Sequence, residues 1–113
     1  EESKRLTFSQ AATGASGIET LLSLSLELYH NGSIKLETII QALTSNPARI
    51  LKINKGNLSI GNDADLCIVD LDKPWIVKKA NLVSKSKNTS IEDKKLQGKV
   101  TNTFVKGKEL FKI

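Results

Sequence analysis

A helix that lacks a polar face limits what this chain can fold into. Residues 18–30 have helical spacing, with Glu19 suited to the first turn and Asn31-Gly32 as a stop signal. Apolar side chains cover more than one stripe of this helix: Ile18, Leu21, Leu22, Leu24, Leu26 and Leu28. We therefore expect the helix to be buried on most sides. Little else in the chain can cover it, so we expect its cover to come from further protein.

The first residue and the composition favour the same interpretation. The chain has 113 residues, begins with Glu1 and contains no methionine, although translation starts with methionine. We interpret it as a piece of a longer protein, with a processed N-terminus as the alternative. No apolar run approaches the ~18 residues that a membrane-spanning helix needs, so we expect no membrane partner.

The positive charge is concentrated in the second half of the chain. The formal net charge is +5, and lysines are frequent from Lys78 onward. A basic half can indicate nucleic-acid binding. These lysines are not interleaved with aromatic side chains, which single-strand binders use as stacking platforms. We interpret them as a solvated surface that keeps strand edges from pairing, and expect no nucleic-acid partner. A basic binding module that stands alone is the alternative.

Two further helices are predicted before residue 57. Leucine and isoleucine recur at helical spacing over residues 36–43, and Ser33 is a candidate cap. A third, short helix is predicted with Asn46 as N-cap and Pro47 at the first helical position. Residues 54–56 are expected to close it.

Strands and turns are predicted in the remainder. The run 64–69 is almost continuously apolar after Asp65, which is typical of a strand covered on both faces. Asp72-Lys73-Pro74 predicts a turn, and Lys106-Gly107-Lys108 predicts the turn of a hairpin. Residues 81–97 are polar and expected to be irregular. Strands are predicted at 58–60, 64–69, 75–77, 100–105 and 109–113.

The residues by themselves show no complete active site. His30 lies at the predicted helix end, where a partial positive charge is stabilised, and Cys67 reads as a small buried hydrophobe within a strand. Four aspartates crowd one region and could ligate a cation, but turns also favour aspartate for local hydrogen bonds: Asp63, Asp65, Asp70 and Asp72. The single cysteine excludes an internal disulfide and favours a reducing, cytoplasmic compartment.

The order of several short segments resembles a known family. Gly17-Ile18-Glu19-Thr20 leads into the apolar helix and is followed by Asn46-Pro47-Ala48. Further along come the segments 61–66, Gly-Asn-Asp-Ala-Asp-Leu, and 84–89, Ser-Lys-Ser-Lys-Asn-Thr. In this order and spacing the chain resembles, over essentially its whole length, the C-terminal part of bacterial-type dihydroorotases of the cyclic amidohydrolase superfamily.

The resemblance implies an α/β fold. Residues 1–53, mostly helical, are expected to be the last part of a metal-bearing (β/α)8 amidohydrolase barrel, followed by the C-terminal strands of a small β-sandwich. We accordingly divide the chain into 1–56, the final barrel loop and closing helices, and 57–113, the C-terminal part of a composite sandwich. The rest of the barrel would then cover the helix at 18–30.

The resemblance also implies a reaction, the interconversion of N-carbamoyl-L-aspartate and L-dihydroorotate in pyrimidine synthesis. In this family zinc polarises the amide and lowers the pKa of a bound water. Its ligands are a His-x-His pair, a carboxylated lysine, two more histidines and an aspartate that is also the general acid and base. None of these occurs here, so we assign no catalytic residue and no metal ligand to this chain. The implied partners are the N-terminal remainder of the enzyme, the small-molecule substrate and further copies in a homo-oligomer.

One functional element of the family matches this sequence. A residue–glycine pair ahead of the Gly-Ile-Glu-Thr segment binds substrate through its main chain, and the matching positions are Thr13 and Gly14. A glycine lets backbone donors approach a carboxylate closely. The chain departs from the family at Thr13, where a bulky apolar residue is frequent, and at Ser90, where proline is usual.

Other readings stay open at this point. A related cyclic amidohydrolase, of the allantoinase or hydantoinase type, shares many of the segments. A non-catalytic dihydroorotase-like protein that serves as an assembly partner would share them too.

Overall fold

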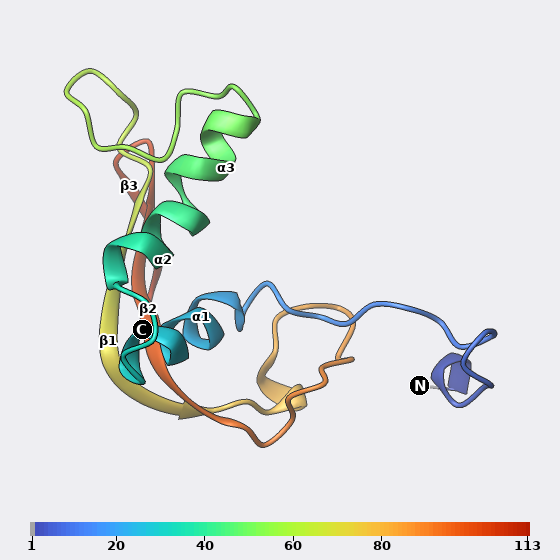
Figure 1. The fold of residues 1–113 in the computed structure, drawn as a ribbon. Coiled ribbons are helices and arrows are strands. Elements are labelled where there is room, and N and C mark those ends of the chain that lie inside the picture. The colour runs from blue at the N-terminus through green and yellow to red at the C-terminus, as the bar shows by residue number, and fades with distance from the viewer. Residues whose placement is uncertain (1) are drawn as a thin grey trace.

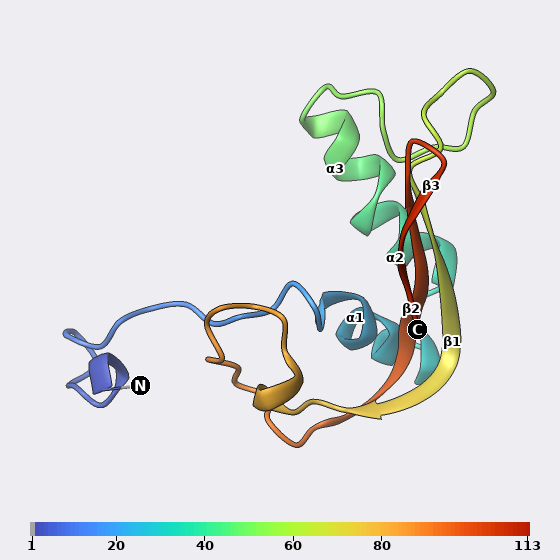
Figure 2. The same cartoon turned by 180° about the vertical axis from the view of Figure 1, so that it is seen from behind.

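The computed structural model describes residues 2–113, which form a curved antiparallel sheet with one helix packed against it (Figure 1). The order of the elements is η1 (Glu2–Lys4), α1 (Leu21–His30), α2 (Leu36–Leu43), α3 (Ser45–Ile50), β1 (Leu66–Ile76), η2 (Lys79–Asn81), β2 (Lys95–Val105) and β3 (Lys108–Lys112). The three strands lie in the order β1-β2-β3, so β2 is central. Seen from behind, β1 and β2 bend together beneath α1 (Figure 2).

Helix α1 is anchored on the sheet by a tight junction at Gly98. The Ser23 hydroxyl donates to the Gly98 carbonyl oxygen at 2.6 Å, and the Trp75 indole N–H is 3.2 Å from each of these two oxygens. Leu26, which is fully buried, lies over Gly98, and a Cβ added there would be 2.3 Å from the Leu26 Cδ1 atom. Gly98 thus lets the helix and the strand approach each other closely.

The predicted helix at 18–30 is shorter than expected and is not buried on most sides by the described residues. It begins at Leu21, and Ile18 is 95% exposed. Leu21 and Leu28 are exposed as well. The described residues bury the face of α1 that meets the sheet and do not cover the leucines on the opposite face.

The other two helices are confirmed, but their caps are not. Helix α2 has the predicted bounds, with Lys35 rather than Ser33 at its N-cap. Helix α3 begins at Ser45, so Thr44 and not Asn46 precedes it. Because Thr44 ends α2 and also precedes α3, no residues remain between the helices for a separate capping turn. The Thr44 hydroxyl donates back to the Ile40 carbonyl instead.

The strand predictions are partly wrong. Strand β1 runs through Asp72-Lys73-Pro74 without turning, because an Asp70 carboxylate oxygen accepts the N–H groups of residues 72 and 73 and the pairing register shifts there. The turn signal therefore marks a bulge. Strand β1 is not covered on both faces, since Cys67 and Ile68 are exposed. The hairpin of β2 and β3 around Lys106-Gly107 is confirmed.

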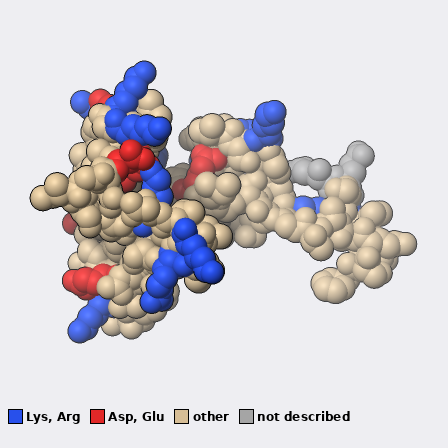
Figure 3. Space-filling model, turned by 90° about the horizontal axis from the view of Figure 1, so that it is seen from above, with Lys and Arg blue, Asp and Glu red and all other residues tan. Residues whose placement is uncertain are grey.

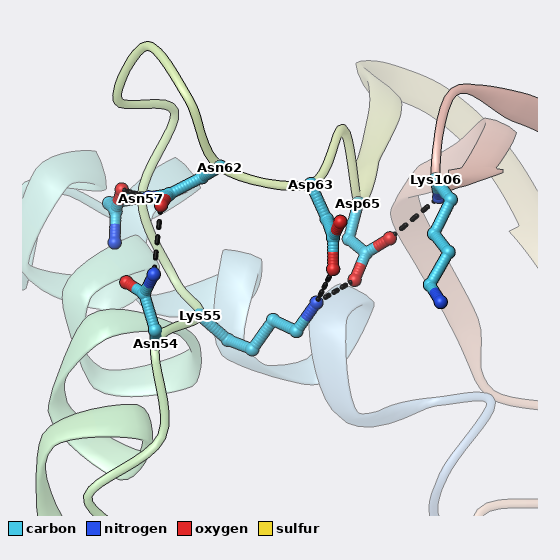
Figure 4. A network of polar contacts seen from close by, with 7 residues as sticks. All are labelled: Asn54, Lys55, Asn57, Asn62, Asp63, Asp65 and Lys106. Atoms are coloured by element: carbon cyan, nitrogen blue, oxygen red, sulfur yellow. Dashed lines mark hydrogen bonds and ion pairs between the residues drawn. The ribbon is translucent and has the colours of Figure 1, made fainter.

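The loop between α3 and β1 is held by polar contacts, and within the described residues it contains no strand at 58–60 (Figure 4). The Lys55 ammonium lies 2.9 Å from Asp63 and 2.5 Å from Asp65. Asp65 also accepts the main-chain N–H of Lys106 at 2.7 Å, so the loop is tied to the β2–β3 turn. The predicted boundary at residue 57 falls in this loop, and the division into two units stays a prediction.

We predict that Gly98→Ala destabilises the protein more than Gly61→Ala. Both glycines have nearly the same left-handed φ, +94° and +93°, so both variants share about 1–2 kcal/mol of backbone strain. Only at Gly98 does the new methyl group collide with Leu26, which adds about 1–3 kcal/mol from overpacking. Midpoints of urea unfolding measure the difference, and equal midpoints would show that the α1 junction is not tightly packed.

Candidate functional site

The segment that contains Thr13 and Gly14 runs beside a second loop from the far end of the chain. In both ribbon views the chain between η1 and α1 passes the loop that precedes β2 (Figures 1 and 2). The Ser16 N–H donates to the Asn88 carbonyl at 2.7 Å, and the Ser16 hydroxyl donates to the Ser86 carbonyl at 2.7 Å. These hydrogen bonds join two segments that lie about seventy residues apart in the sequence.

The Gly14 carbonyl oxygen accepts hydrogen bonds from two side chains. It accepts from the Lys4 ammonium at 2.7 Å and from the Asn88 side-chain amide at 2.9 Å. Lys4 also donates to the Ala12 carbonyl at 2.7 Å. Gly14 has a φ of +88°, a conformation that a side chain disfavours, and no atom lies close to where its Cβ would be.

A hollow of about 390 Å³ opens beside Thr13 and Gly14. Its lining residues come from η1, from the Thr13 segment and from the Asn88 loop: Ser3, Lys4, Thr13, Gly14, Ala15, Ser16, Ser86 and Asn88. The N–H groups of residues 13, 14 and 15 donate to none of the described groups. The hollow is therefore lined by main chain with unpaired N–H groups and by the Lys4 side chain, groups that suit an oxygen-bearing ligand.

Glu19 holds the second loop in place. The structure corrects its predicted position, because Glu19 lies ahead of α1 and not in its first turn. Its two carboxylate oxygens accept the N–H groups of Val83 and Ser84, each at 3.0 Å. The hydrogen bond from Val83, and after it the one from Ser84, lowers the pKa of Glu19 below its ordinary value of 4.5.

The other candidates from the sequence do not form a site. The aspartates serve local hydrogen bonds and ion pairs, as Asp65 and Asp70 show. Among residues 2–113 no cluster of histidine, cysteine, aspartate and glutamate could hold a metal ion. The described residues therefore offer no ligand set for the zinc that the family resemblance implies for the complete enzyme. His30 lies in the last turn of α1, as predicted, with its ring against Tyr29.

Sequence reasoning singled out some of the residues that line this hollow and not the others. It singled out Thr13 and Gly14, and the segment 84–89 as a family signature, but gave Asn88 no role. It missed Lys4 altogether, because a lysine in a polar stretch carries no signal of the carbonyl groups that it will meet.

Basic side chains do not form one continuous patch on the face seen in Figure 3. Lysine and arginine appear there in separate groups, with acidic and uncharged residues between them. No helix within residues 2–113 is long and apolar enough to span a lipid bilayer.

Comparison with known proteins gives one family match. The model of the amidohydrolase family covers residues 7–110. The chain is 44% identical over 109 residues to a dihydroorotase of Ehrlichia chaffeensis, which is 96% of this chain and 24% of that protein. The resemblance seen in the sequence is confirmed. The chain spans about a quarter of the length of the curated relatives it matches.

Solved structures of hydantoinases share the fold. An L-hydantoinase (dihydropyrimidinase) from Arthrobacter aurescens is 31% identical, with a TM-score of 0.86 over 92% of this chain and 24% of its own. A D-hydantoinase superposes with a TM-score of 0.88 over 98% of this chain and 25% of its own at 22% identity, and that likeness shows the fold alone. The fold is therefore that of an amidohydrolase segment.

We predict that acid releases the Val83–Ser84 loop through Glu19. Because the folded-state pKa of Glu19 is lowered, its stabilising contribution is fully present above the ordinary value of 4.5 and is lost as the pH falls through the folded-state pKa. Amide hydrogen exchange of residues 82–84, corrected for intrinsic rates, should increase over that pH range.

Two variants test the assignment to Glu19. In Glu19→Gln the exchange of residues 82–84 should be faster at neutral pH and depend less on acid. Glu37→Gln, at an exposed glutamate of α2 with no bond to this loop, should behave as the parent protein. The same acid response in all three proteins would contradict the role of Glu19.

Proposed function

The chain belongs to the amidohydrolase family, and from this premise we propose that it is a segment of a dihydroorotase. The enzyme would interconvert N-carbamoyl-L-aspartate and L-dihydroorotate, a reversible ring closure with loss of water. The observation that carries the proposal is the 44% identity to a curated dihydroorotase over 96% of this chain.

The segment contributes a main-chain substrate contact. Main-chain groups of Thr13 and Gly14 would contact a substrate oxygen at the hollow that Lys4 and Asn88 also line. Three features support this role: the donors are free within the described chain, Gly14 has an open side without a Cβ, and the hollow carries a positive charge. Main-chain donors arranged in this way bind anionic and carbonyl oxygens.

The chemical step lies outside this chain. A zinc ion would supply Lewis-acid chemistry for the amide carbonyl and for a water molecule. Its ligands would come from the N-terminal remainder of the enzyme, because residues 2–113 contain no cluster that could hold it. The remainder of the barrel, and further copies in a homo-oligomer, are the partners we assign. The single cysteine favours a cytoplasmic enzyme.

A related cyclic amidohydrolase is the second candidate. The observation that favours it is the L-hydantoinase from Arthrobacter aurescens, at 31% identity and a TM-score of 0.86. A non-catalytic dihydroorotase-like assembly partner is the third. The dihydroorotase assignment rests on higher identity over a larger share of the chain than the hydantoinase likeness does.

We predict that the full-length enzyme hydrolyses L-dihydroorotate and cyclises N-carbamoyl-L-aspartate, and that a chelator removes both activities. Ring opening is followed by the loss of dihydroorotate absorbance, with hydantoin and dihydrouracil as competing substrates. Faster turnover of either competitor would favour the hydantoinase reading. Absence of every activity, with metal restored, would favour the non-catalytic reading.

We predict that Gly14→Val in the full-length enzyme raises the KM for dihydroorotate by about tenfold or more. A β-branched side chain disfavours the φ of +88°, so the main-chain donors turn away from the substrate. Gly32→Val is the matched control, because Gly32 has a φ of +76° and equally open space but lies beyond α1. An unchanged KM for Gly14→Val would remove Thr13 and Gly14 from the binding site.

A further inference from the structure

Lys4 holds two carbonyl groups, of residues 12 and 14, in the segment that contains Thr13. Its ammonium donates to the Ala12 and Gly14 carbonyl oxygens, each at 2.7 Å. A single point charge thus holds both oxygens on one side of the segment. Charge-assisted hydrogen bonds of this kind are shorter and stronger than those between neutral groups.

Peptide planarity carries this restraint to the donors. In a trans peptide the N–H points away from the C=O of the same plane, so the Ala12 carbonyl sets the direction of the Thr13 N–H. The Gly14 carbonyl sets the direction of the Ala15 N–H in the same way. Both N–H groups therefore point away from the Lys4 ammonium, and they donate to none of the described groups.

Asn88 holds the same segment from the other side. Its side-chain amide donates to the Gly14 carbonyl at 2.9 Å, while its own carbonyl accepts the Ser16 N–H at 2.7 Å. Residues 14 and 16 are thereby fixed to a loop that Glu19 ties down through Val83 and Ser84. Since the glycine at position 14 has wide backbone freedom, these bonds decide which conformation it keeps.

We propose that Lys4 and Asn88 are positioning residues, which orient the main-chain N–H groups of Thr13 and Ala15 toward an anionic oxygen of the substrate. This inference rests on the proposed function, since it assumes that this segment binds substrate. Neither residue takes part in the chemical step.

The test uses the full-length enzyme and four variants: Lys4→Met, Lys4→Arg, Asn88→Ala and Lys85→Met. Lys4→Met and Asn88→Ala should raise the KM for dihydroorotate by about tenfold and leave kcat within about twofold of the parent value, because they misplace a binding group and spare the reacting atoms. Lys4→Arg keeps the charge and the donors, so it should recover part of the loss. Lys85→Met, at an exposed lysine of the Asn88 loop that bonds to none of the described groups, should match the parent enzyme.

Hydrogen exchange of residues 12–16 in the ligand-free enzyme supplies the second readout. It should be faster in Lys4→Met and in Asn88→Ala, with unfolding midpoints equal to that of Lys85→Met. Faster exchange with an unchanged KM would overturn the proposal, because the two residues would then order a segment that binds no substrate. Unchanged exchange with an unchanged KM would overturn it as well.

The outcomes separate this inference from the proposed function. If the parent enzyme is active and Lys4→Met retains its KM, the positioning role alone fails. If the parent enzyme has no activity on dihydroorotate or carbamoyl-aspartate, the proposed function fails, and the substrate role of Lys4 and Asn88 fails with it. A variant that lowers kcat and the unfolding midpoint together, without partial recovery in Lys4→Arg, would show a merely structural role.

Discussion

The close approach of α1 to β2 at Gly98 is the constraint on which the rest of the structure depends. It is a polar contact enclosed by apolar packing: Ser23, Trp75 and the Gly98 carbonyl share hydrogen bonds beneath the buried Leu26. The Ser23 hydroxyl is buried and needs such a partner, because an unpaired buried donor costs about 1–3 kcal/mol. The junction therefore has one favourable arrangement, which fixes the start of α1 relative to the sheet.

The candidate site follows from that position. Glu19 precedes α1 and reaches the N–H groups of Val83 and Ser84, so the loop ahead of β2 is drawn toward the N-terminal segment. The hydrogen bond from the Ser16 N–H to the Asn88 carbonyl then joins these two segments. Neither segment belongs to a helix or strand, and each is held in place by hydrogen bonds to the other. Loops positioned by a rigid scaffold are where binding groups are commonly found.

The sequence predicted those features that depend on neighbouring residues. Helix α2 and the hairpin at Lys106-Gly107 were anticipated because periodicity and turn chemistry are local. The bulge after Asp70 was not anticipated, since the same Asp-Lys-Pro signal produces a turn or a bulge according to whether a partner strand continues past it. Cys67 was wrongly expected to be buried, because an apolar run does not say how many faces are covered. Family resemblance pointed to Thr13 and Gly14 as candidates, whereas the contacts of Lys4 and Asn88 with the Gly14 carbonyl required the three-dimensional arrangement.

Trp75 gives the molecule an optical property that follows from its place at the α1 junction. It is the one tryptophan of this chain, its N–H is bonded to Ser23 and Gly98, and the Lys99 ammonium lies 5.0 Å from its ring centroid. An indole excited state responds to a nearby positive charge and to contact with water. The emission of this single chromophore therefore reports whether α1 is docked on the sheet, and it does so without a label.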